Sequence, residues 1–397
     1  VDEEDEPDMT TRVGILLTHP IQYFTPWFQA LASTDLDVHV FYCFQPSPEQ
    51  QGEGFGIAFE WNRPLLEGYE SSFLNNVAKK PGFQFTGCDT PEIESIIASK
   101  EFDGWIISGW NTKSYWQAIR TCQRHQVPMA VRGDSHLLGR RSIPVRTAKR
   151  LLFGRWIPRF SAYLTVGKLN EEYYEFYGAD PARFFPVRHF VDNAWFADQA
   201  EKARERREEL QYNLNIRPSS TVFLFCGKFI PMKRVKDFLL AMEQLKSETG
   251  NIHALLVGDG PLRKEYEKLV KERAIPATFT GFVNQKELPE IYAIADVLVL
   301  PSALETWGLV VNEAMAAGLP AVVSDNVGCA PDLVSEGETG TVFPTGNIDE
   351  LAKRLREYLR HPGLARLQGQ KAQSLVMDDY SLESAVHNTV KAMKAIT

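Results

Sequence analysis

Residues 296–324 read DVLVLPSALETWGLVVNEAMAAGLPAVVS, and their pattern indicates the fold class. The two ends, DVLVL at 296–300 and AVVS at 321–324, are short apolar runs rich in valine, which predicts buried β-strands. Between them, a polar loop leads into the apolar run LVVNEAMAA, which predicts a helix. A strand, a helix and a second strand in this order are typical of a parallel sheet that is covered by helices.

The same alternation continues through almost the whole chain. A charge-dense segment, residues 200–218, separates a first series of strands and helices from a second series, and we interpret it as a solvated helix. The pattern therefore predicts an α/β protein with two doubly wound, Rossmann-like domains that face each other across a cleft. The predicted strands are residues 12–17, 37–42, 104–108, 127–132, 162–166, 221–226, 254–257, 277–280, 296–300, 321–324 and 341–343.

The length agrees with this division, because 397 residues exceed the usual size of one domain. We expect an N-terminal domain over residues 9–195 and a C-terminal domain over residues 196–375. A final helical segment, residues 376–397, is predicted to pack back on the N-terminal domain. Residues 1–8 (VDEEDEPD) are interpreted as a disordered acidic leader or as residues left by cloning.

The net charge of −8 is unevenly distributed, because six of the 51 acidic residues lie within residues 1–8. The negative total argues against nucleic acid as a partner, although the rest of the chain is close to balance. No run of about 18 apolar residues is present, so no membrane-spanning helix is expected. The five cysteines form no CxxC or zinc pattern, and we expect free thiols in a cytoplasmic protein.

Two loops of the first half carry polar residues directly after a predicted strand. Ligands of open α/β sheets bind at the carboxyl ends of strands, so these loops are the first places to look for a site. The loop THPIQY at 18–23 has no glycine and is no dinucleotide fingerprint, and helix capping by its histidine is the alternative. The loop RGDSH at 132–136 concentrates polar side chains that suit a site better than a core. The candidate residues are His19, Gln22, Arg132, Asp134 and His136.

The first strand of the second half is followed by CGKFIPMKR at 226–234. Lys228 and Lys233 lie five residues apart at a turn from strand to helix, after Gly227. Two cations there suit a diphosphate, because they neutralise the charge that develops on a leaving group. Two solvated lysines are the alternative, and the loop is no Walker A motif.

The loop and helix at 301–320 contain two carboxylates. Glu305 lies in the loop, and Glu313 lies eight residues later on an apolar helix. Eight helical residues span about 12 Å, which is too far for two carboxylates to share a proton. The spacing suits two carboxylates that bind hydroxyls at opposite ends of one extended ligand. Gly308 lets the backbone approach that ligand closely.

The second half resembles the family-4 retaining glycosyltransferases of the GT-B fold over nearly all of residues 221–360. The first half is similar more loosely, through the HPIQY opening at 19–23 and the RGDSH loop. The motifs that carry the resemblance are Gly227-Lys228 with Lys233, VGDGP at 257–261, GFV at 281–283, ADVLVLPS at 295–302, the stretch from Glu305 to Glu313, and GETG at 337–340.

The resemblance implies a role for each matching residue. Lys228 and Lys233, next to Gly227, would bind the pyrophosphate of a nucleotide sugar, which we expect to be a UDP-linked hexose. Glu313 would hold the ribose hydroxyls, and Glu305 would contact the transferred sugar. The remaining implied positions are the base-binding turn with Val283, the phosphate-binding amides of Trp307, Gly308 and Leu309, and His136 as an active-site histidine near the sugar.

The resemblance also implies a reaction. The sugar would be transferred with retention of its anomeric configuration, without a metal or another cofactor, to an acceptor held on the N-terminal side. The acceptor stays open as a glycan, a lipid-linked molecule or a small molecule. A nucleotide-sugar epimerase or hydrolase on the same fold, and a catalytically silent nucleotide-binding scaffold, remain as alternatives.

One further stretch of the first half suggests a partner. Residues 137–160 contain seven basic residues and no acidic residue, with aromatic side chains interleaved. This composition suits a peripheral contact with an anionic membrane surface, or the binding of a phosphorylated lipid acceptor. A basic helix that packs by its apolar side is the alternative.

Overall fold

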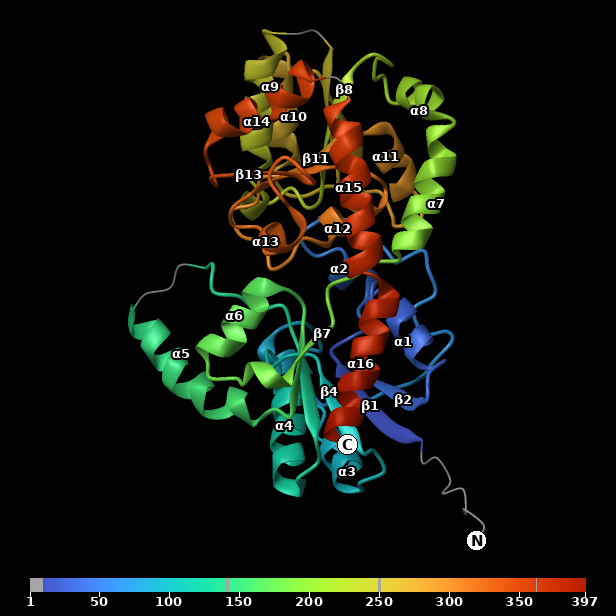
Figure 1. Cartoon of the computed structure of the whole chain (residues 1–397), viewed down its shortest axis with the longest axis vertical. Helices are drawn as coiled ribbons and strands as arrows, with labels where there is room; N and C mark the ends of the chain where they lie inside the picture. Colours follow the sequence, from blue (N-terminus) through green and yellow to red (C-terminus); the bar gives the residue numbers. More distant parts are fainter. Residues whose placement is uncertain (1–9, 140–142, 249–250, 362) are drawn as a thin grey trace.

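Two parallel β-sheets, one in each half of the chain, form the framework of the structure (Figure 1). The structure is a computed structural model that describes residues 10–139, 143–248, 251–361 and 363–397. The predicted acidic leader, residues 1–8, lies outside the described residues. Figure 1 shows the two lobes one above the other, with the N-terminal lobe below.

The N-terminal sheet has seven parallel strands in the order β3-β2-β1-β4-β5-β6-β7. Successive residues of its central strands point to opposite faces, as the period of a strand requires. Leu16 belongs to one apolar cluster, whereas Ile15 and Leu17 belong to another, so both faces are covered. The strands are β1 (Thr11–Leu17), β2 (Leu36–Tyr42), β3 (Glu70–Phe73), β4 (Gly104–Ile107), β5 (Met129–Arg132), β6 (Ala162–Thr165) and β7 (Phe184–Pro186).

The C-terminal sheet has six parallel strands in the order β10-β9-β8-β11-β12-β13. Its order repeats that of the first sheet, with the strand order reversing beside the first strand of each half, and the predicted doubly wound fold is confirmed. The strands are β8 (Thr221–Cys226), β9 (Ile252–Val257), β10 (Ala277–Gly281), β11 (Val297–Leu300), β12 (Ala321–Ser324) and β13 (Gly340–Phe343).

Helices connect the strands and cover the sheets (Figure 1). In the first half they are α1 (Thr25–Leu31), α2 (Pro48–Gln51), α3 (Glu92–Ala98), α4 (Lys113–His125), α5 (Ile143–Trp156) and α6 (Lys168–Phe176). In the second half they are α7 (Asn193–Arg204), α8 (Arg207–Asn213), α9 (Val235–Lys246), α10 (Arg263–Glu272), α11 (Leu288–Ile294), α12 (Leu309–Ala316), α13 (Ala330–Leu333), α14 (Ile348–Arg360), α15 (Leu364–Asp379) and α16 (Leu382–Ile396).

The chain crosses between the lobes twice. It leaves the first lobe after β7 and enters α7, and it returns between α15 and α16, which run one after the other along the molecule in Figure 1. The side chain of α16 residue Met393 lies in the same apolar cluster as Val13 of β1. At the crossing, Asn193 Nδ2 donates to the carbonyl oxygens of Val376 at 2.7 Å and Tyr380 at 3.0 Å. One buried amide therefore joins the two crossings.

We expect Asn193→Ala to lower the free energy of unfolding by about 1–3 kcal/mol, because it leaves two buried carbonyl oxygens without a donor. Urea denaturation followed by circular dichroism measures this loss. The matched control is Asn388→Ala, since Asn388 Nδ2 makes a single exposed hydrogen bond to Pro186. An equal effect of the two substitutions would show that the crossing does not depend on Asn193.

Candidate active site

A cavity of about 250 Å³ lies between the two lobes. The first lobe contributes Tyr23, Phe55 and Trp61, and the second lobe contributes loops that follow β8, β9, β10 and β11. Eight residues that the sequence analysis singled out line this one cavity. They are Gly227, Lys228, Lys233, Val283, Glu305, Gly308, Leu309 and Glu313.

Lys233 and Glu305 form an ion pair between the ammonium group and carboxylate oxygen Oε2. Both side chains are about four-fifths buried, with 18% exposed in each case. Ser302 Oγ donates to the same carboxylate oxygen at 3.2 Å. A cation and a carboxylate are thus held side by side, where one ligand can contact both.

Lys228 is held by a loop of the other lobe. Its ammonium group donates to the carbonyl oxygen of Glu53 at 2.5 Å and lies 5.2 Å from the centre of the Phe55 ring. Burial and the nearby charge of Lys233 both lower the pKa of Lys228. The two cations therefore act on the same region of the cavity, where an anion would relieve their repulsion.

Glu313 has its carboxylate buried between two tyrosine hydroxyls. Tyr23 of the first lobe donates to Oε1 at 2.9 Å, and Tyr292 of α11 donates to Oε2 at 2.5 Å. Only 2% of the residue is exposed, because α12 is apolar and packs in the core. Burial raises the pKa of Glu313 to about 7, although both hydroxyl contacts oppose that rise.

His136 reaches across the cleft from the loop after β5. Its Nε2 lies 3.1 Å from the backbone carbonyl oxygen of Glu305, and its Nδ1 accepts from the amide of Leu138 at 3.2 Å. Since a carbonyl oxygen can only accept, Nε2 carries the proton. Asn170 Nδ2 donates to the carbonyl oxygen of Ser135 at 3.0 Å and supports this loop. His136 thus lies beside the loop that supplies Glu305 but is not among the residues that line the cavity.

Two other residues of the same loop have different surroundings. Asp134 is half-buried. Arg132 is 4% exposed, and its guanidinium group lies 5.0 Å from the Phe24 ring and 5.4 Å from the Trp27 ring. Burial lowers the pKa of Arg132 to about 10. Neither residue lines the cavity.

The candidates of the first loop also lie outside the lining of the cavity. His19 packs against Phe83, with ring centres 4.9 Å apart, and its Nδ1 is 2.8 Å from Thr18 Oγ1. Burial lowers the pKa of His19 to about 4, which keeps the imidazole neutral at pH 7. Gln22 is buried beside the hydroxyl of Tyr23.

The N-terminus of α12 faces the cavity through Gly308 and Leu309. Gly308 has φ +101°, in the left-handed region, and a Cβ there would lie 3.2 Å from Leu300. Trp307 turns away from the cavity, because its indole donates to Asn312 Oδ1 at 2.8 Å. The glycine therefore lets the chain bring the first turn of α12 to the cavity while Trp307 anchors the loop in the core.

Several residues that line the cavity or bind its carboxylate were not among the candidates from sequence, and they include Tyr23, Phe55, Trp61, Gln285 and Tyr292. Tyr23 ends the HPIQY opening, and the segment FGIAFEW at 55–61 is rich in aromatic residues without helical or strand periodicity. An aromatic segment of that kind is a signal for a binding loop. Its contact with the second lobe has no sequence signal.

Comparison with known proteins supports an enzyme. Residues 206–375 match the model of the family described as glycosyl transferases group 1. The matched residues lie within the second half of the chain. The alpha-D-kanosaminyltransferase of Streptomyces kanamyceticus is 30% identical over 192 residues, which are 48% of this chain and 49% of that protein. The chain spans half or less of the length of the first curated relatives that it matches.

Solved structures resemble the whole chain in fold. A glycosyltransferase from Rickettsia africae superposes with a TM-score of 0.76 at 14% identity, over 98% of this chain and 99% of that chain. The Anabaena protein HepE, in complex with UDP and glucose, superposes with a TM-score of 0.70 at 16% identity, over 97% and 100% of the two chains. The predicted GT-B fold is confirmed by these likenesses.

The raised pKa of Glu313 predicts a stability that falls with pH. The folded state keeps the proton up to about pH 7, whereas the unfolded state loses it near 4.5, so stability is lost as pH rises between these values. The loss amounts to roughly 3 kcal/mol. Glu313→Gln removes the ionisation. The melting temperature of this variant, relative to that of the wild type, should therefore rise between pH 5 and pH 8. A difference that stays constant with pH would contradict the burial of an ionisable carboxyl group.

Proposed function

We propose that this protein is a retaining glycosyltransferase of the family-4 class, which transfers a hexose-type sugar from a nucleotide diphosphate donor to an acceptor. The observation that carries the proposal is the shared cavity of Lys228, Lys233, Glu305 and Glu313 at the carboxyl ends of the strands. A UDP-linked donor is supported by the complex of the Anabaena neighbour with UDP and glucose. The acceptor belongs to one of three classes: a glycan, a lipid-linked molecule or a small molecule.

In this proposal the two lysines hold the pyrophosphate. Lys233 would exchange part of its contact with Glu305 for a phosphate oxygen, which leaves that carboxylate able to bind a sugar hydroxyl. Glu313 would hold the ribose hydroxyls from the middle of α12. His136 would lie near the sugar, since its ring already contacts the Glu305 backbone.

The proposed reaction needs no nucleophilic side chain. The bond between the anomeric carbon and the phosphate oxygen breaks, and the acceptor oxygen forms its bond on the same face of the sugar. The departing phosphate takes the proton of the acceptor hydroxyl, so charge and protons balance. The lysines would stabilise the negative charge on the leaving diphosphate, which is the role that a divalent cation has elsewhere. A reaction without metal or other cofactor is therefore part of the proposal.

The proposal is tested first by calorimetric titration with UDP, GDP and ADP, and then by incubation with the corresponding nucleotide sugars. Transfer is detected as nucleoside diphosphate release that depends on an added acceptor, with the anomeric configuration of the product read by NMR. Release without an acceptor would indicate a hydrolase, and an altered sugar without release would indicate an epimerase. Nucleotide binding without any turnover would indicate a catalytically silent nucleotide-binding scaffold.

Lys233→Ala should lower kcat by about 10²- to 10³-fold, because it removes a positive charge from the leaving diphosphate. The measurement is the rate of nucleoside diphosphate release with the donor and acceptor that this screen identifies. Lys236→Ala is the matched control, since Lys236 is exposed on α9 and pairs with Glu265 away from the cavity. Near-normal turnover of the Lys233 variant would refute the role of this residue.

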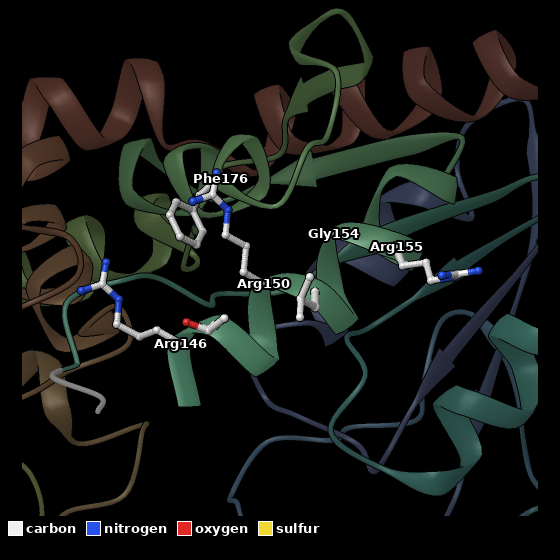
Figure 2. A pocket seen from close by; sticks show the side chains of 7 residues that line it. Arg146, Arg150, Gly154, Arg155 and Phe176 are labelled. Carbon is white, nitrogen blue, oxygen red and sulfur yellow. The ribbon is translucent and has the colours of Figure 1, made fainter. Parts of the chain in front are cut away.

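We also propose that α5 contacts an anionic membrane surface. Of the predicted basic stretch at 137–160, residues 140–142 lie outside the described residues. Leu151 and Leu152 of α5 are 74% and 58% exposed. Figure 2 shows Arg146, Arg150 and Arg155 along the same helix, around a hollow that Leu151 helps to line. Exposed leucines beside arginines suit an interface of acyl chains and phosphate groups.

The same helix is anchored in the lobe from its other side. Phe153 and Trp156 are buried, 8% and 7% exposed, and belong to an apolar cluster of the first lobe. The guanidinium group of Arg150 lies over the ring of Phe176, the last residue of α6, at 5.2 Å from the ring centre (Figure 2). No helix among the described residues is long and apolar enough to cross a bilayer. The proposed contact is therefore a peripheral one.

Flotation with vesicles that contain phosphatidylglycerol tests this contact. We expect Leu151→Ser with Leu152→Ser to reduce the vesicle-bound fraction by about tenfold, because two apolar side chains no longer enter the interface. Leu367→Ser is the matched control, since Leu367 is an exposed leucine of α15, 57% accessible, on the other lobe. Absence of the wild type from the floated fraction at low salt, or equal flotation of the double variant, would refute the contact.

A further inference from the structure

A loop of the first lobe closes one end of the cavity. Phe55 and Phe59 pack against Phe282 of the second lobe, with ring centres 5.0 Å and 4.2 Å apart. Trp61 follows Phe59 at 4.9 Å and lines the cavity together with Phe55. We name residues 53–62 the aromatic loop. It lies against the turn after β10, where the resemblance places the nucleotide base.

Polar contacts tie the aromatic loop to the second lobe along its length. Asn284 Nδ2 donates to the carbonyl oxygen of Glu60 at 2.8 Å, and Asn62 Nδ2 donates to the carboxylate of Glu287 at 3.0 Å. At its other end, Glu53 accepts the hydrogen bond from Lys228. The aromatic loop is therefore held over the turn by contacts at both ends.

Two buried polar atoms in this part of the cavity lack a partner among the described residues. They are the indole Nε1 of Trp61 and the amide oxygen Oε1 of Gln285. Both residues line the cavity, and Gln285 is only 3% exposed. Burying a polar group without a hydrogen bond is costly, so an unpaired donor and an unpaired acceptor at one cavity indicate a ligand that supplies both partners.

We propose that Trp61 and Gln285 recognise the base of the donor nucleotide beneath the aromatic loop. This inference rests on the proposed function, because that function places a nucleotide in the cavity. The indole N–H would donate to a carbonyl oxygen of the base, and the amide oxygen of Gln285 would accept from a ring N–H. A base with a carbonyl oxygen next to a ring N–H, as in uracil, satisfies both atoms, whereas cytosine has no ring N–H to donate.

The two lobes would then share the recognition of the donor. The second lobe holds the pyrophosphate and ribose, and the first lobe contributes the aromatic cover and the indole donor to the base. Because Trp61 belongs to the first lobe and Gln285 to the second, the base site is complete only when the two lobes are in contact, as they are here.

Titration calorimetry with UDP and CDP on the full chain tests the proposal. Trp61→Phe keeps an aromatic ring but removes the N–H, and Gln285→Met keeps the volume but removes the acceptor. We expect each variant to bind UDP about tenfold more weakly, and Gln285→Met to lose the preference for UDP over CDP. Gln244→Met is the matched control, since Gln244 is exposed on α9 and bonds to Asp349.

Melting temperatures without nucleotide separate recognition from a structural role. Atoms reserved for a ligand contribute nothing to the ligand-free fold, so Trp61→Phe and Gln285→Met should melt within a few degrees of the wild type. A large drop in melting temperature, or UDP binding as tight as that of the wild type, would overturn this inference alone. If the wild type binds neither UDP nor CDP but binds another nucleoside diphosphate, this inference fails alone. If it binds no nucleotide, the proposed function fails, and this inference fails with it.

Discussion

The parallel direction of the strands is the constraint on which the rest of the structure depends. A parallel strand can be followed by its neighbour only through a crossover, so every carboxyl end of a strand opens into a loop at the same edge of the sheet. The edges of both sheets meet the same cleft. Glu305 after β11 and Lys228 after β8 therefore line the same cavity, although the two loops are far apart in the sequence.

Closure of the cleft makes each lobe part of the other's site. Glu313 is buried on an apolar helix of the second lobe, and a carboxylate there is costly without donors. One of its two donors, Tyr23, comes from the first lobe. Lys228 likewise depends on the carbonyl oxygen of Glu53. Opening of the lobes would expose these groups to water, whereas a bound nucleotide would offer them new partners.

The predicted strands were confirmed, and the strands that were missed lie at the two edges of the N-terminal sheet. Residues 297–300 and 321–324 are wholly buried, and their apolar runs predicted these strands. The edge strands β3 (ESSF) and β7 (FFP) were not predicted. An edge strand contacts a neighbour on one side only and is here partly exposed, so it needs neither length nor an apolar run. β3 is mostly polar and β7 has only three residues, so neither offers an apolar run of strand length.

The residues of the candidate site also differ in whether local sequence pattern could predict them. Glycines, lysines and glutamates that follow strands are visible in the sequence, because strand pattern and local spacing are short-range properties. Tyr23 and Trp61 are not, because they reach the cavity from the first lobe through the docking of the two lobes. Gln285 follows β10 in the second lobe, but a single glutamine there carries no pattern that marks it. Arg132 and His19 have the residue types of a site but lie among aromatic rings outside the cavity lining. Residue type and local pattern thus specify which groups can do chemistry, and the docking of two sheets selects which of them face one another.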